Sequence, residues 1–285
     1  MSTVSRRPRV KSISSAVLES AAVSCVEAIG ALIQNAICGL DPASRKTWEE
    51  TSERLSSRDL PTILPVSAIR AQMPIVREGI RQELVQQNLG LVEAAKLEAL
   101  MTLQVAPYAC APAILHAPLR ALAEAKTTAQ AQTASGHLIA IAENSHRQVL
   151  AHALVTASRN ASLQAGFSKV DAAPGIDGSI RVIATDAAGR ALVTEIRVDQ
   201  HNDPCLVTEV VGVNDGSCVS IMDRFDRALE QQGVRTETAE RKPTGGVCQL
   251  ATAREVLKKL RARGTTPQSD ARRTPRLSQS PKIRI

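Results

Sequence analysis

Aromatic residues are almost missing from this chain of 285 residues, of which they make up 1%. Proteins that bind single-stranded nucleic acid stack successive bases on several aromatic side chains set in register. Four aromatic residues scattered over the sequence do not provide such a surface, so the composition argues against this class of protein. The four are Trp48, Tyr108, Phe167 and Phe225.

The chain also lacks an uninterrupted apolar run of about 20 residues, the length that spans a bilayer. The nearest run, residues 16–40, is interrupted by polar residues that include Glu19 and Glu27. The same two glutamates lie where a secretory signal peptide needs an apolar core, although the start of the chain is basic and rich in serine. We therefore expect a cytoplasmic protein without a membrane span.

The six cysteines show neither a close pair nor the Cys-x-x-Cys spacing of metal and redox motifs. This pattern predicts reduced and mostly buried thiols. The sequence also has no glycine-rich loop that would cradle a phosphate and no Gly-x-Ser-x-Gly turn of a hydrolase. We expect neither a cofactor nor a bound metal.

The net charge of +7 lies at the two ends of the chain. Residues 254–285 carry ten Lys or Arg against two acidic residues, and residues 1–11 add four Lys or Arg, which leaves a mildly acidic middle. Basic segments so poor in apolar residues predict a disordered start (1–11) and a disordered tail. The tail is consistent with electrostatic contacts to nucleic acid or to an acidic partner, and also with a solvated segment that aids solubility. Its contact residues would be Arg272, Arg273, Arg276, Lys282 and Arg284.

Helical spacing of apolar residues dominates residues 12–165. A first helix is expected before Gly39, and Asp41 followed by Pro42 is typical of the cap and first residue of a second. A long helix is expected to begin at Pro74 and to run to about residue 100. Two alanine-rich segments, 113–134 and 138–164, predict further helices because alanine is the strongest helix former.

Residues 166–250 predict a small α+β domain with an antiparallel sheet. Two β-branched runs, 180–184 and 191–198, flank a short turn that contains Gly189, which is typical of a hairpin. Residues 206–213 predict a third strand, residues 218–230 an amphipathic helix capped by Ser217, and residues 236–241 an edge strand. Residues 251–285 would form a short helix followed by the basic tail.

One face of the predicted sheet carries charged residues. In the second strand Leu192, Thr194 and Ile196 alternate with a more polar set, which is the period of a half-buried strand. We interpret the polar face as solvent-facing and as the surface that contacts a protein partner. Its residues are Val193, Glu195, Arg197, Glu209 and Val211.

The run from Glu209 to Cys218 resembles a small uncharacterised bacterial domain family. Members of this family have a strand, a glycine, a turn such as Gly-Ser-Cys, a helix and a strand, and are often encoded beside AAA-type ATPases. The resemblance covers about residues 178–243. It implies the fold and, by association, an ATPase partner, but it supplies no catalytic residues.

Cys218 is the sharpest candidate for chemistry. A thiol in the first turn of a helix lies near backbone N–H groups and the positive end of the helix dipole, which favours a reactive thiolate. Cys218 also shares an apolar stripe with Ile221, Met222 and Phe225, so a small buried residue between strand and helix is the simpler interpretation.

A metal site has weaker support. Glu143 and His146 have the Glu-x-x-His spacing of helix-bundle carboxylate sites, but such sites need a second copy, which the sequence does not contain. His137, His146 and His152 do not share one helical face at the spacing that would let them hold a metal together.

The order of elements is also similar to the core of restriction-endonuclease-like enzymes. There an acidic residue on one strand and a Glu-x-Lys pair on the next hold a divalent ion against a phosphodiester. Asp186, Glu195 and Arg197 would take these places. Arginine is a departure from this pattern, because a permanently protonated guanidinium does not help to generate hydroxide. A turn-forming Asp186 and a solvated pair of Glu195 and Arg197 are the simpler interpretation.

The sequence thus predicts an α+β protein with a helical N-terminal region (12–165) and a small sheet domain. For function it favours a non-catalytic binding or adaptor protein of a bacterial cytoplasmic complex, with an AAA-type ATPase as candidate partner. A metal-dependent nuclease and a thiol-based redox protein are the two alternatives.

Overall fold

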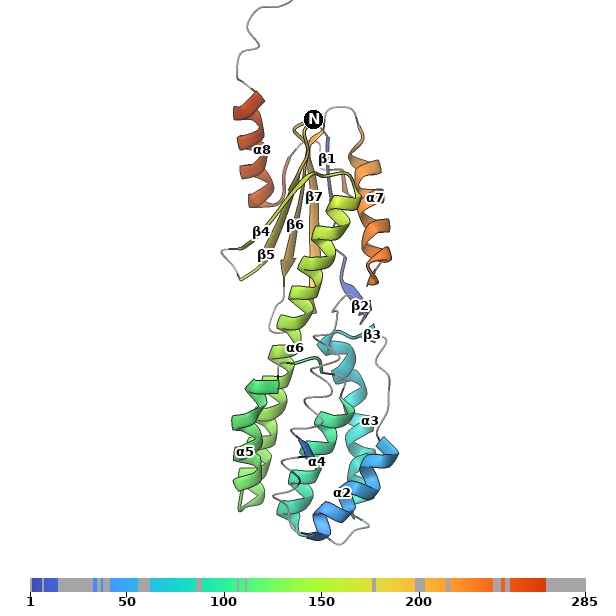
Figure 1. Ribbon diagram of the computed structural model, residues 1–285, viewed down its shortest axis with the longest axis vertical. Helices are drawn as coiled ribbons and strands as arrows, with labels where there is room; N and C mark the ends of the chain where they lie inside the picture. The colour runs from blue at the N-terminus through green and yellow to red at the C-terminus, as the bar shows by residue number, and fades with distance from the viewer. Residues whose placement is uncertain are drawn as a thin grey trace, which may run out of the picture.

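The computed structural model describes residues 2–6, 8–14, 33–34, 37, 42–55, 62–85, 89–106, 108–110, 112–175, 178–197, 203–213, 216–237, 242–243 and 247–264. These residues form an elongated α+β molecule with helices at one end and an antiparallel sheet at the other (Figure 1). We call the two ends the helical module and the sheet module. The fold class predicted from the sequence is confirmed.

The helical module packs around α4, which contacts α2, α3 and α6. Its core contains Trp48 of α2 together with leucines and isoleucines from α3, α4, α5 and α6, all of them almost fully buried. The module consists of α2 (Pro42–Leu55), α3 (Val66–Val85), α4 (Leu91–Val105), the short 3-10 turn η2 (Pro112–Leu115), α5 (His116–Glu124) and the first half of α6 (Thr128–Gln164).

Some helix boundaries differ from the predictions. Helix α2 begins at Pro42 as predicted, but α3 begins at Val66 and continues through Pro74 instead of starting there. The predicted helix over 74–100 is in fact parts of two helices, α3 and α4. The break expected near Gly136 is absent, since one glycine costs a helix only about 1 kcal/mol. Helix α6 instead begins directly after its cap residue, Thr127, whose side chain accepts a hydrogen bond from the backbone N–H of Gln130.

Helix α6 joins the two modules. Its 37 residues give it a length of about 55 Å at 1.5 Å per residue. The first half packs against α4 and α5, and the second half lies on the sheet (Figure 1). A continuous helix therefore fixes the two modules to each other.

The main sheet is antiparallel and has the strand order β4-β5-β6-β7-β1-β9. A second, three-stranded sheet of order β3-β2-β8 lies at the waist, where the two modules meet (Figure 1). The strands are β1 (Ser2–Arg6), β2 (Val10–Ser14), β3 (Thr62–Ile63), β4 (Lys169–Pro174), β5 (Ile180–Thr185), β6 (Ala191–Arg197), β7 (Cys205–Val213), β8 (Val234–Thr236) and β9 (Lys242–Pro243).

The first residues of the chain belong to these sheets, so the predicted disordered start at residues 1–11 is wrong. Strand β1 pairs with β7, and β2 pairs with both β3 and β8. Basic residues alternate here with apolar ones, and Val10 and Ile13 are buried in the core. This alternation is typical of a strand, whereas the prediction of disorder was based on net charge alone.

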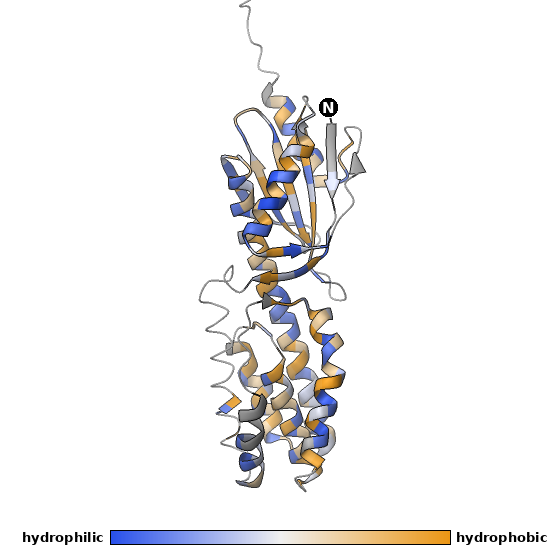
Figure 2. Cartoon of the chain, turned by 90° about the vertical axis from the view of Figure 1, so that its right-hand side faces the viewer, coloured by the Kyte–Doolittle hydropathy of each residue, from blue (hydrophilic) through white to orange (hydrophobic). Residues whose placement is uncertain are grey.

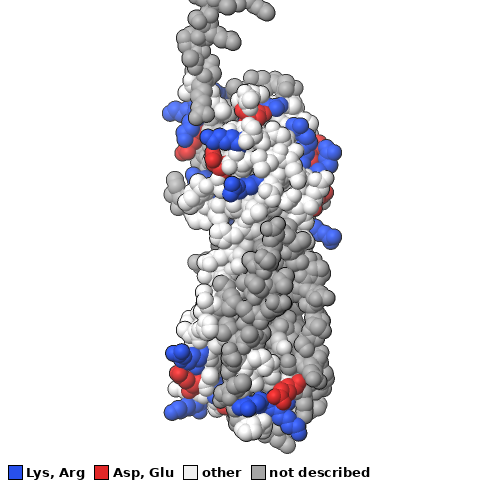
Figure 3. Space-filling model, viewed as in Figure 1, with Lys and Arg blue, Asp and Glu red and all other residues white. Residues whose placement is uncertain are grey.

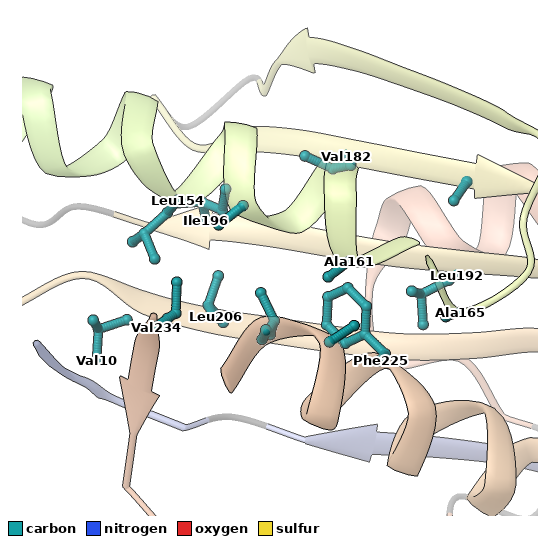
Figure 4. Close-up of a cluster of buried hydrophobic side chains, with 14 of the residues drawn as sticks. Val10, Leu154, Ala161, Ala165, Val182, Leu192, Ile196, Leu206, Phe225 and Val234 are labelled. Carbon is teal, nitrogen blue, oxygen red and sulfur yellow. The ribbon is translucent and has the colours of Figure 1, made fainter. Parts of the chain in front are cut away.

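Helices α6 and α7 (Cys218–Gln231) cover one face of the main sheet. Phe225 of α7 and Ala161 of α6 meet Leu192 and Ile196 of β6 in one core (Figure 4). Small residues on α6 let the helix approach the strands closely. Figure 2, in which α7 faces the viewer, shows hydrophilic residues along its outer side, as predicted for an amphipathic helix.

Helix α8 (Ala251–Gly264) covers the opposite face, as Figure 1 shows. Four buried residues of this C-terminal segment, Cys248, Leu250, Ala253 and Leu257, pack on Ala191, Val193, Val207 and Val211 of the sheet. The sheet is therefore enclosed between helices on both faces. Within the described part of the chain, no helix is long and apolar enough to cross a membrane.

Gly212 explains the glycine of the strand-turn-helix motif. Its φ is +79°, and a Cβ there would overlap the backbone oxygen of Gly189 in the neighbouring hairpin. We expect Gly212→Ala to lower the free energy of unfolding by about 2 kcal/mol, because it adds a clash to an unfavourable backbone conformation. Chemical denaturation measures this loss. Gly189→Ala is the matched control, with φ +75° but open space around the Cβ, and should cost about 1 kcal/mol. Equal losses in the two variants would contradict the close approach.

Candidate functional sites

The predicted partner surface lies beneath α8. Val193, Glu209 and Val211 have no solvent-exposed area, and Glu195 is 3% exposed. The prediction of a solvent-facing row is therefore wrong for these four residues, and only Arg197 of the predicted five is exposed. The alternation of residues along β6 was assigned correctly, but the covering helix comes from a distant part of the chain.

Glu209 anchors the beginning of α8. Its carboxylate oxygens accept hydrogen bonds from the backbone N–H groups of Gln249 (2.8 Å) and Leu250 (3.1 Å), just before the helix starts. A carboxylate at this place satisfies N–H groups that have no partner within a helix and faces the positive end of the helix dipole. A buried strand residue thus acts as the cap of a helix about 40 residues away.

Glu195 makes a second polar contact with the same segment. It accepts a hydrogen bond from the Thr252 hydroxyl (2.9 Å) and one from Arg197 (2.8 Å). Arg181 on β5 also lies 3.7 Å from its carboxylate. Two arginines and one hydroxyl therefore compensate the burial of this carboxylate.

The structure does not bring the three nuclease candidates together. The carboxylate of Asp186 closes the hairpin turn, because it accepts a hydrogen bond from the backbone N–H of Arg190 (2.9 Å) and forms an ion pair with the guanidinium of the same residue (2.6 Å). Glu195 pairs in register with Arg181 on β5, whereas Asp186 follows Thr185, the last residue of that strand. Arg181 and Thr185 are four residues apart, a distance of about 13 Å along the strand, so Asp186 lies far from Glu195. Among the described residues, no group of three His, Cys, Asp or Glu side chains is placed to hold a metal ion.

Cys218 lies at the start of α7 and is 4% exposed within the main core. Its thiol points to the carbonyl oxygen of Gly216 at 3.9 Å. This environment matches the structural interpretation of Cys218, because a reactive thiol needs access to solvent. In the described part of the chain Cys110, Cys205, Cys218 and Cys248 form no disulfide.

Glu143 and His146 form a hub at the waist instead of a metal site. The Nδ1 atom of His146 accepts a hydrogen bond from the backbone N–H of Ala109 (2.8 Å). The Nε2–H of His146 donates to the carbonyl oxygen of Leu64 (2.7 Å). Glu143 pairs with Arg70 and accepts a hydrogen bond from Tyr108 (3.3 Å). One turn of α6 thus ties together segments that follow β3 and α4.

Stability should depend on pH through His146. Burial lowers the pKa of His146 below its ordinary value, since the side chain has no exposed area. The unfolded chain therefore binds this proton more readily than the folded one, and stability should be complete above pH about 6.5 and fall as the pH decreases below it. Denaturation midpoints between about pH 7 and 5 measure this loss. In a His146→Gln variant the slope should be smaller, and an unchanged slope would contradict the assignment.

Two further groups of predicted residues play no part in these sites. His137 and His152 lie exposed on α6. The five tail residues, Arg272, Arg273, Arg276, Lys282 and Arg284, lie outside the described residues.

A cleft that was not predicted from the sequence lies in the helical module between α3 and α6. It has a volume of about 650 Å³ and is lined by Arg70, Met73, Pro74, Arg77, Glu78, Arg81, Tyr108, Ile139 and Glu143. Three arginines follow one another at helical spacing along one side of α3. That spacing is visible in the sequence, but surface arginines at helical spacing are too common to indicate a site by themselves.

Comparisons with known proteins do not extend these observations. No family model matches the sequence, and neither the curated proteins nor the solved structures contain a match.

Proposed function

We propose that this chain is a non-catalytic adaptor of a bacterial cytoplasmic complex and that it binds an amphipathic helix on the β6–β7 face of its sheet. The observation that carries the proposal is the surface of the sheet on which α8 packs. That surface combines apolar residues, Val193, Val207 and Val211, with a buried carboxylate, Glu209, that caps α8. These are the features by which a surface recognises a helix and its direction.

In this proposal α8 occupies the site when no partner is bound. The outer side of α8 is basic, with Arg254, Lys258, Lys259 and Arg261 exposed around one acidic residue, Glu255. Figure 3 shows Lys and Arg side chains in this region of the molecule. An acidic partner surface would attract the displaced helix and its basic tail, which helps an incoming helix to take its place.

An AAA-type ATPase is the partner to test first, on the strength of the resemblance around Glu209 to Cys218. Affinity capture from the native host with and without ATP, followed by mass spectrometry, makes this test. Leu257→Ser should increase the amount of captured partner, because it loosens α8 without changing the sheet. Lys258→Ser, an exposed neighbour, is the control and should leave capture unchanged.

Two results would contradict the adaptor function. One is cleavage of DNA or RNA that requires Mg²⁺ or Mn²⁺ and is abolished by Glu195→Ala, which would identify a nuclease. The other is rapid alkylation of Cys218 in the folded protein at neutral pH, which would favour thiol chemistry. Nucleic acid captured alone and lost at moderate salt would assign binding to the basic tail.

A further inference from the structure

One arginine in the cleft between α3 and α6, Arg77, differs from its neighbours Arg70 and Arg81, which each pair with a glutamate. Arg70 forms a two-point contact with Glu143, and Arg81 pairs with Glu98 at 3.1 Å. Arg77 lies between them on the same side of α3. Its Nε is buried and has no hydrogen-bond partner among the residues that the structure describes.

An unpartnered Nε–H in a cleft costs free energy, because a buried donor has lost its water without gaining an acceptor. Glu143 does not serve as the acceptor, since Arg70, Tyr108 and Arg147 share its carboxylate. Glu78 is exposed, next to Arg77 in sequence, and accepts a hydrogen bond from Gln82. The acceptor that suits Arg77 is therefore one that enters the cleft from outside.

Three apolar residues also line the cleft, Met73 and Pro74 of α3 and Ile139 of α6. Pro74 has no N–H, so the helix lacks the hydrogen bond that residue 74 would donate to the carbonyl of Arg70. A volume of about 650 Å³ that offers an apolar wall beside a polar anchor, Arg77, is large enough for a small molecule.

We propose that this cleft binds a small molecule with an oxyanion and an apolar body. The oxyanion, a carboxylate or a phosphate monoester, accepts hydrogen bonds from Arg77, whose planar guanidinium matches either group. The apolar body lies against Met73, Pro74 and Ile139. Glu78 and Glu143 repel a second anionic group, which limits the site to ligands with a single oxyanion. The proposal is independent of the adaptor function, which concerns the sheet module.

Tyr108 provides a specific probe, since it is the one tyrosine of the chain and lines the cleft. The protein is labelled with 3-fluorotyrosine, and its single ¹⁹F signal is followed during titration with benzoate, phenyl phosphate and inorganic phosphate. We expect saturable shifts with at least one of the two aromatic anions and weaker binding of inorganic phosphate. Whether benzoate or phenyl phosphate binds more tightly distinguishes a carboxylate from a phosphate ligand.

Arg77→Met should weaken this binding about tenfold or more, because it removes a charge-assisted hydrogen bond. Arg77→Lys keeps the charge but not the planar fork, and should give an intermediate affinity. The control is Arg120→Met, an exposed arginine on α5, which should bind like the unmodified protein. The proposal is overturned if none of the three anions gives a saturable shift at about 10 mM, or if Arg77→Met and Arg77→Lys both bind like Arg120→Met.

Discussion

Glu209→Gln is expected to detach α8 from the sheet while the rest of the fold remains. The carboxylate accepts two backbone N–H groups, whereas an amide presents one oxygen and an NH₂ group that faces a donor. With hydrogen bonds to a buried charge worth about 1.5 to 3 kcal/mol each, the docking of α8 should weaken by about 3 kcal/mol. Hydrogen exchange should become faster at Gln249 and Leu250 and throughout α8.

Cys248 reports the same event chemically. Burial raises the pKa of the Cys248 thiol, and the charge of Glu209 raises it further. Both effects keep the thiol protonated and slow to alkylate at neutral pH. Release of α8 should increase alkylation of Cys248 by about tenfold or more, measured by peptide mass spectrometry. Glu230→Gln, at an exposed position on α7, is the control. Unchanged exchange and alkylation in Glu209→Gln would show that Glu209 does not hold the helix.

His146→Ala should lower the free energy of unfolding by about 4 kcal/mol. The substitution leaves the Leu64 carbonyl and the Ala109 N–H buried without their partner, and each unsatisfied group costs about 1 to 3 kcal/mol. It also removes the ring that packs edge-on against Tyr108, with centroids 5.8 Å apart. Chemical denaturation followed by circular dichroism measures the change.

The matched control for this prediction is His152→Ala, an exposed histidine on the same helix. It should change the free energy of unfolding by less than about 0.5 kcal/mol. Similar losses in the two variants would mean that the hydrogen bonds of His146 do not fix the waist. A loss confined to His146→Ala would show that this turn of α6 joins the modules.

Local patterns in the sequence predicted the sheet module well. The alternation in β6, the turn at Gly189 and the start of α7 at Cys218 all depend on residues close in sequence. The hairpin and the amphipathic helix α7 are therefore confirmed. Ser217 takes the predicted cap position, but its side chain makes no capping hydrogen bond to the helix. The error over β1 and β2 arose because Val4 and Val10 pair with strands more than 200 residues away.

The candidate site was predicted less well than the fold. Glu195 and Glu209 were assigned to solvent because glutamates are rarely buried without partners. Their partners Thr252 and the backbone N–H groups of Gln249 and Leu250 lie 40 residues or more further along the chain than the two glutamates, and no local pattern connects them. The same holds for the cleft at Arg77, which exists only because α3 and α6 lie together.

The measurement that most directly tests the helix-binding face is the affinity of a labelled peptide of residues 247–264 for the full chain. In fluorescence anisotropy the peptide should bind the Leu257→Ser variant saturably, because α8 of that variant dissociates from the β6–β7 face. The peptide should bind the unmodified chain far more weakly. Adding Glu209→Gln to Leu257→Ser should then reduce the affinity. Equal binding to the unmodified and Leu257→Ser chains, or none to either, would contradict the account of the β6–β7 face as a helix-binding surface occupied by α8.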